Sequence, residues 1–202
     1  MPIFAIVKNY PNSNNNMSDS LENAFPLYLL NDIVTLKRYL NVDDIGPYRL
    51  AILDQDILEI PYRIYNKPLS MTQINSLPYN QQLMLSCIFT RHHDGFIRHK
   101  MIRNIIYLHP ILKENDFVIP YIFVLLGEYV VEICIELYPY IQSNKKVFTQ
   151  FLEKNKALNL LTYQRAVSYW NEYYRKTKYA HFHKYPVKIT FDLFEKNHQS
   201  NR

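Results

Sequence analysis

The sequence predicts an all-α fold, an α-solenoid in which pairs of amphipathic helices stack against their neighbours. Three observations support this prediction. Apolar residues recur at helical spacing along most of the chain, and a helix–turn–helix pattern recurs after 33 residues. Glycine is scarce, with 3 among 202 residues, which disfavours folds that need many tight turns with positive φ.

The composition fits one globular domain, with 48% hydrophobic and 20% charged residues. We expect residues 1–20 to form a flexible N-terminal arm, residues 21–180 a single helical-repeat domain, and residues 181–202 a C-terminal extension. No apolar run reaches the ~18 residues of a membrane helix. Cys87 and Cys134 both lie in apolar runs, so we expect reduced, buried thiols in a cytoplasmic protein.

The first expected helix covers residues 25–40, where Pro26 suits a helix N-terminus and apolar residues keep helical spacing. The segment 41–68 contains one glycine and three prolines, and the sequence leaves open whether its pieces are helical or extended. The second expected helix covers residues 76–93. One of its faces is apolar and carries Leu83, Met84, Cys87 and Ile88.

Three further helices are expected in the middle of the chain. Residues 95–107 form an amphipathic pattern that Asp94 is well placed to cap. Residues 117–126 are apolar all round, as in a buried helix, and Gly127 ends this run. Residues 128–141 form the third helix, with an inward face of Val130, Val131, Cys134, Ile135 and Leu137.

The C-terminal third contains a short helical pattern at 147–154 and the clearest one at 158–176. The latter has an apolar and aromatic stripe of Tyr163, Ala166, Val167, Trp170, Tyr173 and Tyr174. Residues 185–194 alternate weakly between apolar and polar side chains, which indicates a strand or an ordered extension.

The repeat appears when the chain is shifted by 33 residues, which places Ile97-Arg98 on Val130-Val131 and Met101 on Cys134. Each of the two helices follows a glycine and another helical run. One such pair cannot bury its apolar faces alone, so this pattern predicts a stack of helix pairs.

The stretch "DGFIRHKMIRNI" resembles the second-helix entry of a HEAT-type repeat, where an Asp in the turn precedes a hydrophobic-Arg pair. Asp94, Ile97, Arg98 and Met101 match these roles, whereas the second copy has Glu128 for the Asp and Val131 for the Arg. With "TRHHDG" and "GEYVVEI", residues 76–142 are similar to bacterial proteins of this armadillo-type helical-repeat class. The resemblance implies that Asp94 bonds to amides of its own helix, and to Arg98 or an arginine of a neighbouring repeat.

Three histidines near this turn raise the alternative of a metal or catalytic centre. His92 and His93 are adjacent and would point about 100° apart on a helix, and no HExxH or Cys/His ligand pattern is present. We therefore expect no metal and no cofactor. The favoured interpretation is a structural turn formed by His93, Asp94, Gly95 and, in the second copy, Gly127. An enzyme that uses His92, His93 and Asp94 remains the weaker alternative.

The run 165–188 holds six Lys or Arg and one acidic residue, so the basic character of the chain is local. Cations interleaved with aromatic rings are typical of single-stranded nucleic-acid binding. That alternative would use the cations Arg165, Arg175, Lys176 and Lys178, with stacking by Tyr174, Tyr179 or Phe182.

A repeat signature without a catalytic motif favours a non-catalytic binding module for a protein partner, a class that includes specific inhibitors and immunity proteins. We expect contacts from Arg98, Arg103 and the helix at 158–176. The candidate contact residues in that helix and just after it are Arg165, Tyr174, Arg175, Lys176 and Lys178.

Overall fold

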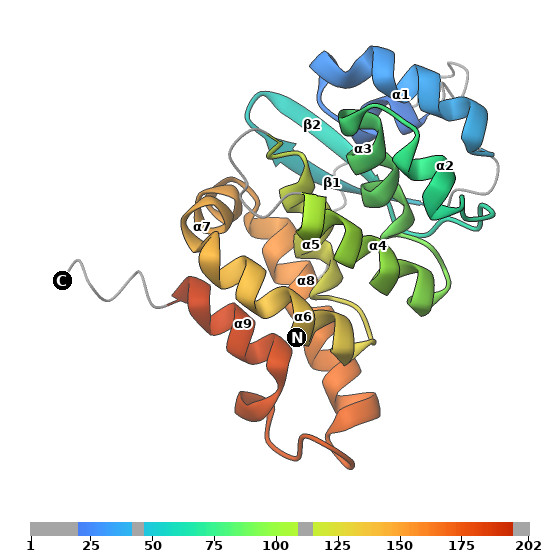
Figure 1. Cartoon of the computed structure of the whole chain (residues 1–202). Coiled ribbons are helices and arrows are strands. Elements are labelled where there is room, and N and C mark those ends of the chain that lie inside the picture. Colours follow the sequence, from blue (N-terminus) through green and yellow to red (C-terminus); the bar gives the residue numbers. More distant parts are fainter. Residues whose placement is uncertain (1–19, 42–46, 109–114, 196–202) are drawn as a thin grey trace.

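Helices form most of the structure, and one β-hairpin lies at its N-terminal side (Figure 1). The structure is a computed structural model that describes residues 20–41, 47–108 and 115–195. The predicted helical class is confirmed. The predicted N-terminal arm, residues 1–20, lies outside the described residues except for Ser20.

The N-terminal segment is a series of short helices. It contains the 3₁₀ helices η1 (Ser20–Ala24) and η2 (Leu27–Leu29), the helix α1 (Leu30–Leu36) and the 3₁₀ helix η3 (Lys37–Tyr39). The expected single helix over 25–40 is therefore only half α-helical. Its apolar spacing still predicts the inward side chains, which are Leu29, Ile33, Leu36 and Leu40.

The segment that the sequence left open forms an antiparallel hairpin of β1 (Tyr48–Leu53) and β2 (Asp56–Pro61). Leu53 pairs with Asp56, so the turn contains two residues, and the first of them, Asp54, has a φ of 51°. Aspartate tolerates this left-handed conformation better than most residues. One face of the hairpin is buried, and the other exposes Leu50, Ile52 and Ile57.

The side chain of Asn155 ties the outer edge of β1 to the junction of two C-terminal helices. Its Oδ1 accepts a hydrogen bond from the Ile52 amide at 2.7 Å, and its Nδ2 donates to the Ile52 carbonyl at 2.8 Å. Nδ2 also donates to the Phe151 carbonyl at 2.8 Å. One side chain thus reproduces the two bonds that a neighbouring strand would make at this residue.

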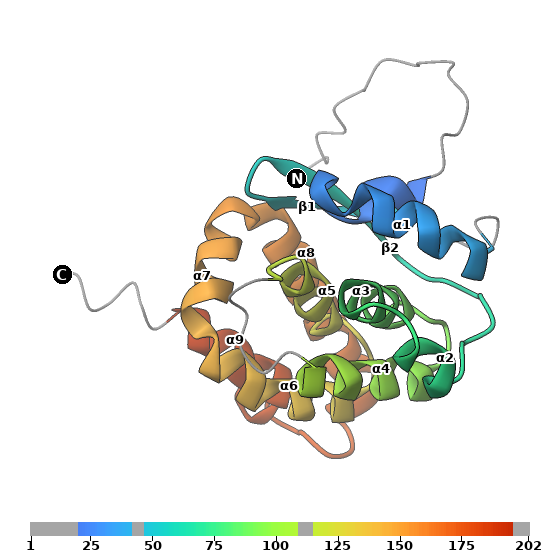
Figure 2. The ribbon, with the colours of Figure 1, turned by 45° about the horizontal axis from the view of Figure 1, so that its top comes forward.

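Two helix pairs occupy the middle of the molecule, after the short helix α2 (Met71–Asn75). The first pair is α3 (Tyr79–Phe89) and α4 (Gly95–Leu108), and the second is α5 (Val118–Leu125) and α6 (Val131–Ser143). In Figure 2, α3 and α5 lie side by side, with α4 and α6 in the layer below them. The sequence predicted all four helices.

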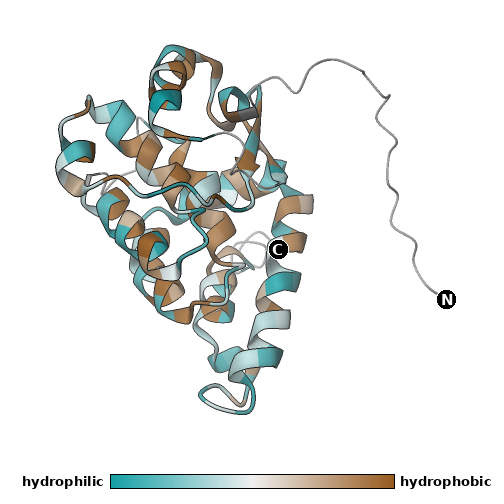
Figure 3. Cartoon of the chain, turned by 90° about the vertical axis from the view of Figure 1, so that its right-hand side faces the viewer, coloured by the Kyte–Doolittle hydropathy of each residue, from teal (hydrophilic) through white to brown (hydrophobic). Residues whose placement is uncertain are grey.

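The burial of these helices follows the sequence prediction with one exception. Every residue of α5 is buried, as the all-apolar pattern indicates. On α6 the expected inward residue Ile135 is 45% exposed, and Ile133 is buried in its place. The outer helices carry both polar and apolar residues (Figure 3), and among the described residues no helix is long and apolar enough to cross a membrane.

The C-terminal part contains α7 (Lys145–Lys154) and α8 (Lys156–Tyr169), which continues into the π-helical turn η5 (Trp170–Tyr174). After the 3₁₀ turn η6 (Phe182–Lys184), α9 (Pro186–Glu195) packs against α6. The expected aromatic stripe on α8 is mostly half-buried, and Tyr173 is 54% exposed.

The interpretation of 185–194 as a strand or extension is wrong, because these residues form α9. Pro186 suits the first turn of a helix, and the buried residues Val187, Thr190, Phe191 and Phe194 have helical spacing. The described part of the expected C-terminal extension therefore belongs to the packed helical body.

Candidate functional site

The turn between α3 and α4 is held by the ring of His92, which is 3% exposed. The Asp94 amide donates to Nδ1 at 3.0 Å, so the ring proton is on Nε2, which lies 3.0 Å from the Asn66 carbonyl. Burial lowers the pKa of His92 and outweighs the bond to Asn66, which raises it. Both nitrogens of His92 therefore bond to backbone groups, which fix the ring in the turn.

Asp94 caps α4, because its Oδ1 accepts a hydrogen bond from the Phe96 amide at 2.8 Å. The helix-amide bond that the resemblance implies is therefore present. The guanidinium of Arg98 instead bonds to carbonyls of the preceding turn, with Nη1 at 2.7 Å from the His92 oxygen and 2.9 Å from the His93 oxygen.

Arg98 is fully buried, so it cannot contact a partner protein as the sequence analysis expected. Its guanidinium lies over the ring of Tyr129, 5.4 Å from the ring centre, and closes the turn from the inside. Nε and Nη2 have no hydrogen-bond partner among the described residues. The guanidinium of Arg98 thus stabilises the turn from its buried side, through the carbonyls of His92 and His93.

A pocket of about 660 Å³ lies between the start of α4 and the α5–α6 connection. Its lining residues come from both helix pairs and are His93, Asp94, Gly95, Phe96, His99, Tyr129, Val130 and Glu132. The ring of Phe96 is 87% exposed beside it. Gly95 allows the start of α4 to lie close to Val130, because a Cβ at this position would lie 3.3 Å from Val130 Cγ2 and 3.5 Å from Arg98 Nη2.

The surface continues from this pocket along α4 and α6. Glu136 on α6 pairs with His99 and also with Arg103, whose Nε lies 3.3 Å from Oε1. Arg103 is exposed, as a contact residue must be. A second hollow of about 370 Å³ follows, and its lining residues are Arg103, Ile106, Tyr107, Glu136, Pro139, Tyr140 and Ser143.

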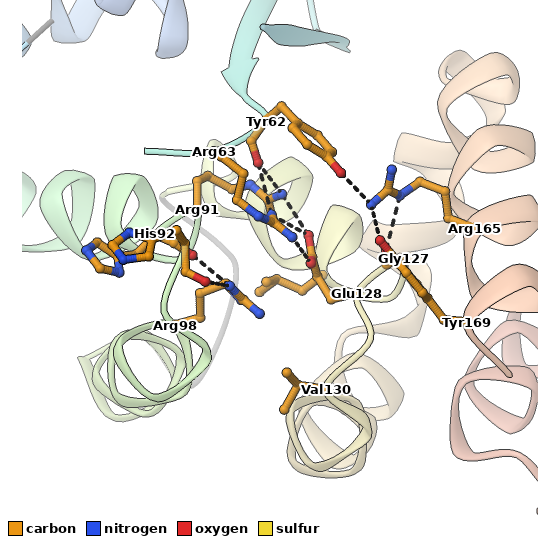
Figure 4. A network of polar contacts seen from close by, with 12 residues as sticks. Tyr62, Arg63, Arg91, His92, Arg98, Gly127, Glu128, Val130, Arg165 and Tyr169 are labelled. Carbon is orange, nitrogen blue, oxygen red and sulfur yellow. Dashed lines mark hydrogen bonds and ion pairs between the residues drawn. The ribbon is translucent and has the colours of Figure 1, made fainter. Parts of the chain in front are cut away.

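A polar network lies behind the pocket and centres on Glu128, which is 0% exposed (Figure 4). Its Oε1 accepts from Arg63 Nη1 at 2.9 Å and from Arg91 Nη2 at 2.8 Å, and its Oε2 accepts from Arg63 Nη2. Burial alone would raise the pKa of Glu128, but the two arginines outweigh it and lower the pKa to about 2. The carboxylate is therefore charged at neutral pH.

Arg165 on α8 joins the network from the other side of Tyr62 (Figure 4). Its Nε donates to the Gly127 carbonyl at 3.2 Å, and its Nη2 donates to the hydroxyls of Tyr62 at 3.0 Å and Tyr169 at 2.9 Å. The side chain is half-buried, so Arg165 is part of this network and is not a fully exposed cation of the basic C-terminal segment.

The basic C-terminal segment is exposed at Arg175, Lys176 and Lys178, as expected. The Tyr174 hydroxyl donates to the Tyr129 carbonyl at 2.5 Å. The rings of Tyr179 and Phe182 pack against other aromatic side chains, at 5.6 Å from Tyr185 and 5.0 Å from Trp170. The three rings proposed to stack on bases are thus engaged in packing.

The sequence analysis assigned His93, Asp94 and Gly95 to a structural turn, and it predicted neither the pocket that they line nor the network behind it. Its members come from distant segments: Arg49 on β1, Tyr62 and Arg63 after β2, Arg91 after α3, and Glu128 after α5. The sequence contained one signal, because Glu128 stands in place of the Asp in the second segment of the expected repeat. A carboxylate that is buried just after an apolar helix requires a cationic partner.

The described residues contain no group of three His, Cys, Asp or Glu side chains that could hold a metal ion. Comparisons with protein-family models, with curated proteins and with solved structures find no match for the chain.

Proposed function

We propose that the chain is a non-catalytic binding module of HEAT-like helix pairs that docks a protein partner on the α4–α6 surface. The observation that carries this proposal is the pocket of about 660 Å³ that two successive helix pairs build together, with Phe96 87% exposed beside it. Exposed aromatic rings beside a pocket are typical of the anchors that carry most of the energy in protein interfaces.

The arrangement of the helices supports a repeat-type docking surface. The first helices of the two pairs, α3 and α5, pack against each other, and so do the second helices, α4 and α6. Stacked repeats present their second helices as one continuous surface. On this surface the two hollows follow one another, separated by the contacts of Glu136 with His99 and Arg103.

The walls of the pocket indicate the chemistry of the docked side chain. Phe96, Tyr129 and Val130 contribute apolar surface, and four polar residues surround it, namely His93, Asp94, His99 and Glu132. An apolar or aromatic anchor of the partner would fill the centre, and polar groups around the anchor would fix its orientation.

The test is affinity capture of partners from native lysate with three versions of the chain. Phe96→Ala removes the exposed ring, and Leu27→Ala is the control because Leu27 is 72% exposed on η2. We expect a protein that wild type and Leu27→Ala retain equally and that Phe96→Ala retains about tenfold less, as for a hot-spot residue. Equal retention by all three versions, or no specific partner, contradicts the proposal.

A second candidate function, nucleic-acid binding, is supported by the exposure of Arg175, Lys176, Lys178 and Lys184 in one segment. No acidic residue lies between Glu172 and Asp192. A gel shift with single-stranded DNA should show binding that weakens steeply between about 50 and 200 mM salt. The triple variant Arg175→Gln, Lys176→Gln, Lys178→Gln should bind more weakly, and absence of binding at the lower salt removes this candidate.

A further inference from the structure

Four arginines surround Tyr62, and we name them the arginine cluster: Arg49, Arg63, Arg91 and Arg165. The guanidinium carbons of Arg49, Arg63 and Arg165 lie 4.9, 5.0 and 5.0 Å from the centre of the Tyr62 ring. Arg91 belongs to the cluster because it shares Glu128 with Arg63 and donates to the Tyr62 carbonyl at 3.0 Å.

The arginine cluster holds more positive charge than the described residues neutralise. Glu128 is the carboxylate of the cluster, and both of its oxygens bond to Arg63 and Arg91. Arg49 and Arg165 form no ion pair with a carboxylate in the described part of the chain. Four guanidiniums and one carboxylate leave a formal excess of three positive charges.

Arg49 is the least compensated member of the arginine cluster. It is 8% exposed, and its buried Nη1 has no hydrogen-bond partner among the described residues. Burial, followed by the charges of Arg91 and Arg165, lowers the pKa of Arg49 to about 10, so the group is still charged at neutral pH. A buried, unpaired charge is destabilising, and a bound anion would remove that cost.

Two phenolic hydroxyls bonded to Arg165 provide further hydrogen-bond donors. The hydroxyl oxygens of Tyr62 and Tyr169 accept from Arg165, which leaves both O–H groups able to donate. Tyr62, Tyr169 and Arg165 are only half-buried, so a ligand can approach from solvent on their side. With Nη1 of Arg49, these groups offer a set of donors for an oxyanion.

We propose that Arg49, Arg165 and the hydroxyls of Tyr62 and Tyr169 form a binding site for a phosphoryl group. A carboxylate would neutralise one of the three excess charges, whereas a phosphate carries about −1.5 to −2 at neutral pH and matches the excess better. Its oxygens accept the forked donors of guanidinium groups. The site is independent of the docking pocket and of the partner proposed above.

The experiment is calorimetric titration of the full chain with inorganic phosphate at constant ionic strength, with chloride as the compensating salt. Arg49→Met and Arg165→Gln should each weaken phosphate binding by about tenfold or more, because each removes a charged donor. Arg38→Gln is the matched control, since it removes an exposed arginine outside both the arginine cluster and the basic C-terminal segment. Phosphate binding that is absent in wild type, or unchanged in both cluster variants, overturns the proposal.

Thermal unfolding gives a readout that does not depend on the variants. Phosphate should raise the Tm of wild type above its value in chloride of equal ionic strength, and no rise would overturn the site.

Arg49→Met should unfold at an equal or higher urea midpoint than wild type without phosphate, since it removes an unpaired buried charge. A clearly lower midpoint would show that Arg49 is structurally compensated and would count against the site.

A second titration distinguishes the source of the phosphoryl group, with N-acetyl-phosphoserine amide as the probe. Tighter binding of this probe than of inorganic phosphate supports a phosphorylated side chain as the ligand. Tighter binding of inorganic phosphate supports a free phosphate ion. Either result requires the same loss in Arg49→Met and Arg165→Gln.

Discussion

The two turns at corresponding places of the helix pairs use their carboxylates in opposite ways. In the α3–α4 turn, Asp94 is half-buried and bonds to the Phe96 amide of its own helix. In the α5–α6 turn, Glu128 is fully buried and bonds to Arg63 and Arg91, while α6 begins without a side-chain cap at Val130. The first carboxylate stabilises a helix, and the second connects distant segments.

This difference shows that a carboxylate in the turn of a helix pair can either cap its own helix or bond to distant segments. The longer side chain of Glu128 reaches arginines from the hairpin side and from the end of α3. Burial makes this pair far more sensitive to the loss of one member than an exposed cap. Substitutions at the two turns should therefore differ both in size and in their dependence on pH.

The largest effect is expected from Glu128→Gln. This change leaves Arg63 and Arg91 buried without their carboxylate and should lower the free energy of unfolding by about 3–5 kcal/mol. Urea denaturation followed by circular dichroism measures it. The control Glu132→Gln changes an exposed residue and should stay within about 0.5 kcal/mol of wild type, and a similar loss in both variants would contradict the central place of Glu128.

The free energy of unfolding should depend on pH through the ionisation of Glu128. The pKa of its carboxyl is about 2 in the folded chain and 4.5 as its ordinary value. Because folding depresses the pKa, the stabilisation is present in full above pH 4.5 and is lost as the pH falls from there to about 2. Linkage makes this loss roughly 3 kcal/mol.

Urea midpoints measured between pH 6 and pH 2 should show the loss in wild type and a flatter curve in Glu128→Gln. Asp94→Asn is the comparison, since it keeps Glu128 and should retain the acid-side loss. Parallel curves for wild type and Glu128→Gln would show that other carboxyls cause the acid sensitivity.

Substitution of the glycines in the two turns by alanine should change the free energy of unfolding by an intermediate amount. A Cβ at Gly127 would lie 3.3 Å from the backbone oxygen of Thr162 and 3.2 Å from its Cγ2, so Gly127→Ala forces the α8 backbone to move. We expect a loss of about 1–3 kcal/mol. At Gly95 the closest atom is on the side chain of Val130, and the higher helix propensity of alanine offsets the contact, so Gly95→Ala should change stability by less than about 1 kcal/mol.

The smallest effect is expected from Asp94→Ala. It removes the cap on the Phe96 amide and should lower the free energy of unfolding by about 1 kcal/mol. Asp94→Asn keeps an oxygen in the same place and should restore most of the loss. If Asp94→Ala cost as much as Glu128→Gln, the contrast between the two turns would be wrong.

Local rules in the sequence predicted the parts of the fold that depend on neighbouring residues. The spacing of apolar side chains predicted α3 to α6, and the position of Asp94 before an amphipathic run predicted its cap. The hairpin was left open because its turn, Asp54-Gln55, lacks the glycine that marks such turns. The helix α9 was missed because its spacing also fits a weak alternation.

The sequence did not predict the parts of the candidate site that depend on tertiary contacts. Arg98 was expected to contact a partner, because arginine is rarely buried without a partner, yet two carbonyls of the turn after α3 accept its hydrogen bonds. The arginine cluster depends on contacts between residues up to 116 positions apart, Arg49 and Arg165, which both contact Tyr62. No local pattern carries that information.

The amide of Asn155 has a consequence for how the chain behaves at high concentration. An unpaired strand edge can template pairing with a second molecule, and the hairpin also carries the exposed apolar residues Leu50, Ile52 and Ile57. By occupying both backbone groups of Ile52, one side chain blocks the end of that edge next to the hairpin turn against intermolecular β-sheet growth. Colloidal stability of the molecule thus depends in part on an asparagine that lies about a hundred positions away in the sequence, at 155.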